Sequence, residues 1–137
     1  MNKYIELKNK HQKEVDKFPM MFAFSQKQFE EGMKKLGVTS KEELVSIGHG
    51  GFVRETDAEA YVQMFKRMIS EEGEAMNDPE YCYEMFRYEL SNHEYCITYD
   101  LEETLDSLGL TEEEVMENPM LFDALNRARR DYLRSVD

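Results

Sequence analysis

The sequence predicts a mainly α (α+β) fold, a compact bundle of about six or seven helices with a small antiparallel sheet of two or three strands. Three observations indicate this fold. Apolar residues recur at helical spacing over most of the chain, helix-starting residues precede several of these stretches, and only short runs are β-branched or aromatic. With 137 residues, 41% of them hydrophobic, the chain can bury a core as a single α-rich domain spanning residues 1–137.

The N-terminal part predicts two helices joined by an extended segment. Residues 3–18 place apolar side chains near one helix face, and Pro19 limits that helix. The run MMFAF at residues 20–24 is too short for an independent helix, so we expect a short buried strand or extended segment. Ser25 is suited to cap a second helix, which Gly37 would end in a left-handed conformation.

A short internal repeat predicts two helix–turn–helix corners. Residues 36–42 (LGVTSKE) and 108–114 (LGLTEEE) both contain a helix-stopping Gly, an apolar residue and a Thr-x-x-Glu capping box. We interpret both as structural corners and not as DNA-reading motifs, because the carboxylates around the second corner would repel phosphates.

Between these corners, the glycine-rich segment GHGGFV at residues 48–53 is expected to be a connecting loop that leads into a short strand. It matches neither a P-loop nor a dinucleotide-binding fingerprint. A capping box at residues 56–59 then opens a helix. The side chains that this helix is expected to bury are Tyr61, Val62, Phe65, Met68 and Ile69.

The stretch from Asp78 to Asp100 predicts the central buried helix of the fold. Asp78 can cap it, and Pro79 suits its first position because the missing N–H would be unpaired there. Its buried face is expected to contain Tyr81, Cys82, Met85, Phe86 and Leu90. The following run, residues 95–99, is β-branched and aromatic and predicts a short strand. A further helix runs to the second corner, and a last helix begins at residues 118–119 (Asn-Pro).

Charge is the most informative property of this sequence. The net charge is −12, but residues 1–54 hold ten Lys/Arg against seven Asp/Glu, whereas residues 71–117 hold sixteen Asp/Glu against Arg87 alone. Such an acidic block repels nucleic acid and anionic lipid and attracts basic surfaces.

No apolar run approaches the roughly 18 residues of a membrane span, and no signal-peptide pattern begins the sequence, so we expect a cytoplasmic protein.

Few side chains indicate catalysis. Glu89 and His93 are spaced i,i+4 and would share a helix face, so together with His49 they suggest an alternative function as a small metal-assisted or acid–base hydrolase. Cys82 is too far along the helix to join them, and no H-E-x-x-H pattern occurs. Both Cys82 and Cys96 lie among acidic and aromatic residues, which favour an unreactive thiol. We therefore expect no metal and no cofactor.

Three groups of residues resemble a family of small uncharacterised proteins carried by phages and mobile elements of Gram-positive bacteria. They are FAFS at 22–25 with Gln28, Phe29 and Gly32; GGF at 50–52 with Thr56 and Asp57; and NHEY at 92–95 with TYD at 98–100. The resemblance covers roughly residues 20–115 and brings no catalytic motif. It implies a genetic context in which small acidic proteins include inhibitors of restriction and CRISPR nucleases.

These observations predict a non-enzymatic interaction protein, an acidic nucleic-acid mimic that binds a basic protein surface such as that of a host defence nuclease, and binds neither nucleic acid nor membrane directly. Interleaved tyrosines would supply anchoring contacts; they are Tyr81, Tyr83, Tyr88, Tyr95 and Tyr99. The carboxylates expected to bind the partner are Glu71, Glu72, Glu74, Asp78, Glu80, Glu84, Glu102, Glu103, Glu112 and Glu113. A structural or regulatory module with a merely solubilising acidic face is the other alternative.

Overall fold

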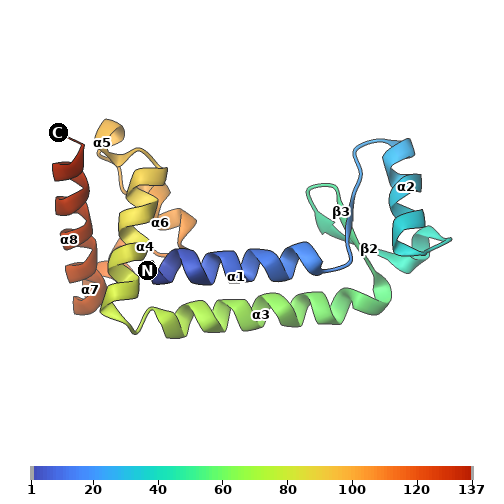
Figure 1. Ribbon diagram of the computed structural model, residues 1–137, viewed down its shortest axis with the longest axis horizontal. Coiled ribbons are helices and arrows are strands. Elements are labelled where there is room, and N and C mark those ends of the chain that lie inside the picture. Colours follow the sequence, from blue (N-terminus) through green and yellow to red (C-terminus); the bar gives the residue numbers. More distant parts are fainter. Residues whose placement is uncertain (1, 137) are drawn as a thin grey trace. The chain divides into compact units, whose positions relative to one another are not determined.

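The computed structural model describes residues 2–136, and within that range it contains eight α-helices, two short 3₁₀ helices and one three-stranded antiparallel sheet. The elements in chain order are α1 (Lys3–Lys17), β1 (Met21–Phe22), α2 (Gln26–Leu36), η1 (Lys41–Glu43), β2 (Leu44–Gly48), β3 (Gly51–Arg54), η2 (Glu55–Asp57), α3 (Ala58–Ala75), α4 (Pro79–Asn92), α5 (Tyr95–Thr98), α6 (Glu102–Ser107), α7 (Glu112–Glu117) and α8 (Pro119–Ser135) (Figure 1). The predicted mainly helical fold with a small sheet is confirmed. The helix count exceeds the expected six or seven because α5 has only four residues and α6 and α7 six each.

The contacts of the chain divide it into two compact units. The first unit joins the N-terminal residues up to Lys10 to the segment from Glu71 onward, and the second consists of His11–Ser70. Counted over the sequence, the first unit has eight Lys/Arg against twenty Asp/Glu, and the second has nine of each. The entire net charge of −12 therefore belongs to the first unit. Whether the chain behaves as one domain, as the sequence predicts, stays a prediction.

Helix α4 lies at the centre of the first unit. The Asp78 side chain caps it by accepting a hydrogen bond from the backbone N–H of Glu80 at 3.0 Å, and Pro79 occupies the first turn, as predicted. The five apolar residues predicted on its inner face are all buried. They pack most extensively against α8, and α6 and α5 also contact α4 (Figure 1). Burial of this face against α8 is thus the main source of the hydrophobic core in this unit.

The strand predicted at residues 95–99 is wrong, because the structure places a single helical turn, α5, there. Glu94 and Tyr99 bracket this turn with left-handed backbone conformations, at φ 50° and 53°. The Tyr99 N–H donates to the carbonyl of Tyr95 at 2.8 Å, and the Tyr95 ring is buried in the core. All three described strands belong to the second unit, so this apolar run has no neighbouring strand in its own unit and satisfies its backbone locally.

The second predicted corner, which precedes α7, is confirmed. Gly109 adopts a left-handed conformation at φ 69°, and the Thr111 hydroxyl accepts a 3.1 Å hydrogen bond from the N–H of Glu114. At the start of α8 the Asn118 side chain accepts hydrogen bonds from the N–H groups of Met120 and Leu121. These caps fix the first turns of α7 and α8, and the first turn of α7 carries part of the predicted acidic surface.

The sheet of the second unit has the strand order β1-β3-β2. Met21 pairs with Phe52 in this sheet, and Phe29 and Leu36 of α2 pack in the same cluster together with Val38, which follows the helix. Ser25 caps α2 and Gly37 ends it at φ 72°, as predicted. Of the segment 20–24 expected to be a buried strand, only residues 21–22 form a strand, and Phe22 is exposed because alternate strand residues face opposite sides.

The first predicted helix–turn–helix corner is wrong. After Gly37 the chain forms one 3₁₀ turn, η1, and then strand β2, instead of a second helix. The capping box is also shifted by one residue, because the Ser40 side chain caps η1 and the Glu43 carboxylate accepts from the N–H of Ser40 at 3.1 Å. A capping box can begin a single 3₁₀ turn as well as a long helix. The local sequence pattern therefore does not tell a 3₁₀ turn from an α-helix.

The glycine-rich segment is confirmed as a connecting loop. His49 and Gly50 form the turn between β2 and β3, and these two residues and Gly48, the last residue of β2, have positive φ angles of 53°, 79° and 87°. His49 is therefore one of three described non-glycine residues in the left-handed region.

Helix α3 buries less of its apolar face than the sequence predicts. The expected capping box gives a 3₁₀ turn, η2, before α3 begins at Ala58. Only Met68 of the five expected residues is fully buried, whereas Val62 is 47% and Ile69 67% exposed. Within the second unit, Phe18, which follows α1, contacts the Tyr61 ring, and Tyr61 packs against Phe65, so these two α3 residues are half-buried.

No helix in residues 2–136 combines the length and the apolar character needed to cross a membrane.

Candidate protein-interaction surface

The ten carboxylates predicted to bind a partner all belong to the first unit and come from four helices and a cap. Glu71, Glu72 and Glu74 end α3; Asp78, Glu80 and Glu84 begin α4; Glu102 and Glu103 begin α6; and Glu112 and Glu113 begin α7. Seven of them are exposed, and Glu71, Asp78 and Glu84 are partly covered. The structure divides this set into carboxylates that the chain already neutralises and carboxylates that it leaves unpaired.

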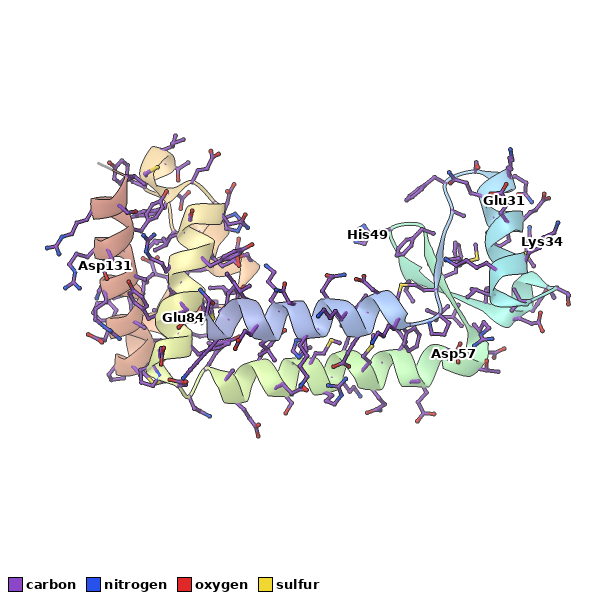
Figure 2. All side chains as sticks on the ribbon, viewed as in Figure 1. Glu31, Lys34, His49, Asp57, Glu84 and Asp131 are labelled. Carbon is purple, nitrogen blue, oxygen red and sulfur yellow. The ribbon has the colours of Figure 1, made fainter. Side chains whose placement is uncertain are left out.

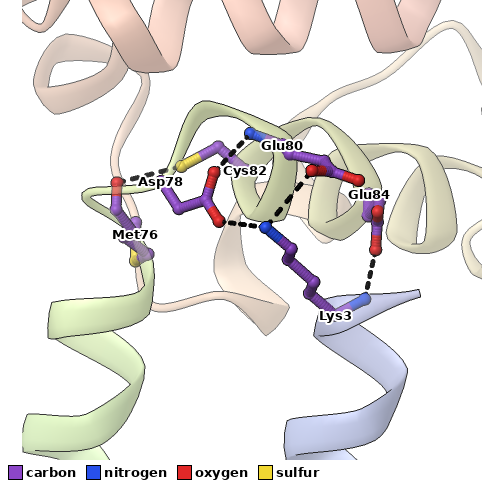
Figure 3. A network of polar contacts seen from close by, with 6 residues as sticks. All are labelled: Lys3, Met76, Asp78, Glu80, Cys82 and Glu84. Carbon is purple, nitrogen blue, oxygen red and sulfur yellow. Dashed lines mark hydrogen bonds and ion pairs between the residues drawn. The ribbon is translucent and has the colours of Figure 1, made fainter. Parts of the chain in front are cut away.

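Lys3 neutralises the carboxylates at the start of α4. Its Nζ lies 2.7 Å from Asp78 Oδ2 and 3.2 Å from Glu80 Oε2, and its backbone N–H donates to the Glu84 carboxylate (Figure 3). The Lys3 hydrogen bond holds the pKa of Asp78 below its ordinary value, and the same contact raises the pKa of Lys3. Asp78 also caps α4, so these carboxylates have structural roles in addition to any binding role.

A groove between α5, α6, α7 and α8 is lined by four carboxylates. Its volume is about 700 Å³, and its apolar lining comes from Tyr95, Leu101, Leu105 and Leu110. Arg129 is the only basic residue of the described chain that lines it. We call Asp100, Glu102, Asp106 and Glu112 the groove carboxylates. None of these four forms an ion pair with a Lys, Arg or His of residues 2–136.

Two groove carboxylates, Asp100 and Asp106, were not among the residues predicted from the sequence. Asp106 is four residues after Glu102 on α6, so both lie on the same helix face, and this spacing was available in the sequence. Asp100, two residues before α6, accepts a 2.8 Å hydrogen bond from the N–H of Glu102, the first residue of this helix. An Asp shortly before a predicted helix can also be recognised in a sequence, but the position of Asp100 in a groove depends on the fold.

Tyr99 is the exposed aromatic residue of this groove. Its ring is 67% exposed and packs edge-on against Tyr95, with ring centroids 5.8 Å apart. Of the other tyrosines expected to anchor a partner, Tyr81 and Tyr95 are buried and Tyr83 and Tyr88 half-buried. The Tyr83 hydroxyl already donates a 2.7 Å hydrogen bond to Asp131. Tyr99 is thus the one tyrosine of this set that is free to contribute a large contact area.

Glu89, the carboxylate of the alternative hydrolase, is closed to solvent. Glu89 is 2% exposed and accepts hydrogen bonds from the Tyr4 hydroxyl at 2.7 Å and the Asn92 amide at 3.2 Å. His93 shares its helix face, as predicted, with Nε2 3.8 Å from Glu89 Oε1. His49 belongs to the hairpin turn of the other unit. Among residues 2–136 no group of three or more His, Cys, Asp and Glu is placed to hold a metal ion.

The two cysteines are free thiols. Cys82 is fully buried, burial raises its pKa to about 11, and its Sγ donates to the carbonyl of Met76 at 3.1 Å (Figure 3). A thiol with a raised pKa is a poor nucleophile at neutral pH, in agreement with the predicted inert role of Cys82.

The fold and this surface define a small, mainly α-helical protein with a small antiparallel sheet and a strongly acidic unit. The chain belongs to a family of unknown function, DUF7659, whose model matches residues 3–131. No curated protein and no solved structure matches the chain. The family description gives no activity, so a functional conclusion depends on the surface itself.

Proposed function

We propose that this chain is a non-enzymatic interaction protein that binds the basic, nucleic-acid-binding surface of another protein through the carboxylates of its first unit. The target we propose is a host defence nuclease of the restriction or CRISPR type, which the chain inhibits by occupying its nucleic-acid groove. One observation carries the proposal: the net charge of −12 is confined to one unit, and there the four groove carboxylates have no internal cationic partner.

Helical geometry supports the mimicry of phosphates. Residues four apart on a helix have Cβ atoms about 5–6 Å apart, so Glu102 and Asp106 present two negative charges at a fixed spacing. Glu112 supplies a third charge from α7 across the same groove. Hydrogen bonds at the starts of α6 and α7 order the backbone that carries these side chains, and this preorganisation favours affinity. The exposed Tyr99 ring adds contact area that charge alone does not provide.

The resemblance to proteins of phages and mobile elements supports the choice of target class. Proteins of such elements benefit from blocking host nucleases, and the positive groove of a nuclease is a surface to which a negative array is complementary. The carboxylates paired with Lys3 are secondary in this proposal, because a partner would have to displace the Lys3 ammonium to reach Asp78 and Glu80.

The test is an inhibition assay with purified restriction and CRISPR nucleases at low and high salt. We compare wild type with a variant carrying Glu102→Gln, Asp106→Asn and Glu112→Gln, which keeps Asp100 and its hydrogen bond from the Glu102 N–H at the start of α6. A matched control carries Asp16→Asn, Glu55→Gln and Glu59→Gln, three exposed carboxylates of the second unit. Circular dichroism establishes that all three proteins are folded.

The proposal expects inhibition that competes with nucleic acid, weakens at high salt, and is lost in the groove variant but kept in the control. If the groove variant inhibits as well as wild type, the groove carboxylates only solubilise the protein. If no nuclease of either class is inhibited, the proposed target class is wrong.

A further inference from the structure

A second groove runs along α2 in the second unit and differs in chemistry from the acidic groove. Its volume is about 690 Å³, and its apolar lining comes from Phe29, Met33 and Val38. Lys27, Lys34 and Lys41 also line it, and the Lys41 ammonium lies 6.0 Å from the centroid of the Phe29 ring.

The charges of this groove favour an acidic, partly apolar occupant. None of its three lysines forms an ion pair with a carboxylate of residues 2–136. Glu30 and Glu31 also line the groove, and the Glu30 carboxylate accepts from the Gln26 amide at 3.3 Å. Figure 2 shows Glu31 and Lys34 on α2. Three lysines against two glutamates give the groove a small positive charge in a unit that is neutral as a whole.

The chain itself contains a segment with the complementary chemistry. Met116 on α7 is 63% exposed, and Glu112 and Glu113 precede it by four and three residues, so these three side chains share a helix face. Neither glutamate forms an ion pair within residues 2–136. Methionine is unbranched and polarizable and fills irregular apolar grooves well.

We propose that the α2 groove of one molecule binds α7 of a second copy of this chain. Met116 enters the groove over Phe29 and Met33, and Glu112 and Glu113 pair with the lysines on its rim. This contact places the acidic unit of one molecule against the neutral unit of another. It therefore avoids the repulsion that would arise if two acidic units faced each other.

The contact joins two different surfaces, so it is heterologous and extends into chains or rings of molecules as the concentration rises. This inference does not depend on the proposed function. It has one consequence for that function, because Glu112 belongs to both surfaces. Self-association and binding of a basic partner then compete for α7.

The test is sedimentation velocity of the full chain over a range of protein concentrations, at low and high salt. Wild type is expected to increase in average mass with concentration, less so at high salt. The variants K34E/K41E and E112K/E113K are each expected to stay monomeric, with a dissociation constant raised at least about tenfold, because like charges then meet in the contact. The control K10E/K66E changes the net charge as much as K34E/K41E and is expected to associate like wild type.

A mixture of K34E/K41E with E112K/E113K provides the decisive result. The first variant retains the native α7 and the second retains the native groove, so the mixture restores the native contact and its mass is expected to rise. The proposal is overturned if wild type is monomeric at every concentration. It is also overturned if either variant associates as strongly as wild type, or if the mixture of folded variants stays monomeric.

Discussion

The hydroxyl of Tyr4 donates a 2.7 Å hydrogen bond to the carboxylate of Glu89, which lies 85 residues further along the chain. Glu89 is the only acidic residue of the described chain that is fully buried. The Lys8 ammonium lies 3.8 Å from the same carboxylate, so the first half of α1 supplies both a hydrogen bond and a positive charge to it. A carboxylate in a low-dielectric interior requires such partners, and α1 is therefore joined to α4 by polar contacts as well as by packing.

Substitution of Tyr4 by Phe is expected to destabilise the protein by about 1–3 kcal/mol, because it removes a donor from a buried carboxylate and keeps the ring. Urea denaturation followed by circular dichroism measures the change. Tyr99→Phe is the matched control, since the exposed Tyr99 hydroxyl has no hydrogen-bond partner in residues 2–136, and its effect is expected to stay within about 0.5 kcal/mol. Equal effects of the two substitutions would contradict the structural role of Tyr4.

Replacing two helix glycines by alanine is expected to change the stability of the protein in opposite directions. At Gly32 an added Cβ would lie 2.6 Å from Met21 Cε and 3.0 Å from Met21 Cβ, so overpacking at about 1–3 kcal/mol outweighs the gain in helix propensity. At Gly73 nothing lies within 4 Å, so alanine there is expected to stabilise α3 by about 0.5–1 kcal/mol. Thermal unfolding of the two variants checks both signs, and a stabilised G32A variant would show that Met21 moves aside freely.

The contact between Tyr83 and Asp131 is expected to make stability depend on acid pH. The Tyr83 hydroxyl, followed by the Arg130 guanidinium, holds the pKa of Asp131 below its ordinary value of 3.8. A carboxyl group whose pKa is lower in the folded than in the unfolded protein stabilises the fold at pH values above its unfolded-state pKa. This stabilisation is lost as the pH falls through the folded-state pKa. Tyr83→Phe is therefore expected to unfold at a lower temperature than wild type at neutral pH, with the gap closing below pH 3.8. A gap that stays constant with pH would assign the effect to packing alone.

Cys82 is expected to resist alkylation in the folded protein. Its side chain is fully buried and its pKa is raised to about 11, so little thiolate forms at pH near 8 and that thiolate is out of reach. In a Cys96→Ser variant, mass spectrometry after iodoacetamide treatment is expected to show no adduct in buffer and one adduct in denaturant. Rapid labelling in buffer would mean that α4 opens readily.

Helix starts and ends were predictable because they depend on neighbouring residues. Asp78-Pro79 and Asn118-Pro119 begin α4 and α8 where the sequence placed them, and the buried face of α4 is the predicted one. A cap side chain reaches a backbone N–H only two or three residues away, so the signal and its partner are both visible in a short window.

The predictions that failed depend on contacts between distant residues. The apolar run at residues 95–99 has the composition of a strand, but its unit offers no strand to pair with. Lys3 pairs with Asp78 across 75 residues, and no pattern in the sequence relates the two. Sequence reasoning identified only Glu102 and Glu112 among the groove carboxylates; the i,i+4 spacing of Asp106 from Glu102 was visible in the sequence, but that they line one groove depends on how α5, α6, α7 and α8 pack.

The composition of the first unit has a consequence for synthesis on the ribosome. Residues up to Lys10 are synthesised before the second unit, but their own unit is completed only by the segment from Glu71 onward. At about 5–20 residues per second, Tyr4 is made roughly 4–17 s before Glu89, its partner 85 residues later. All of His11–Ser70 emerges during this interval, so the order of translation delivers the complete neutral unit before the acidic one can close around the N-terminal turns of α1.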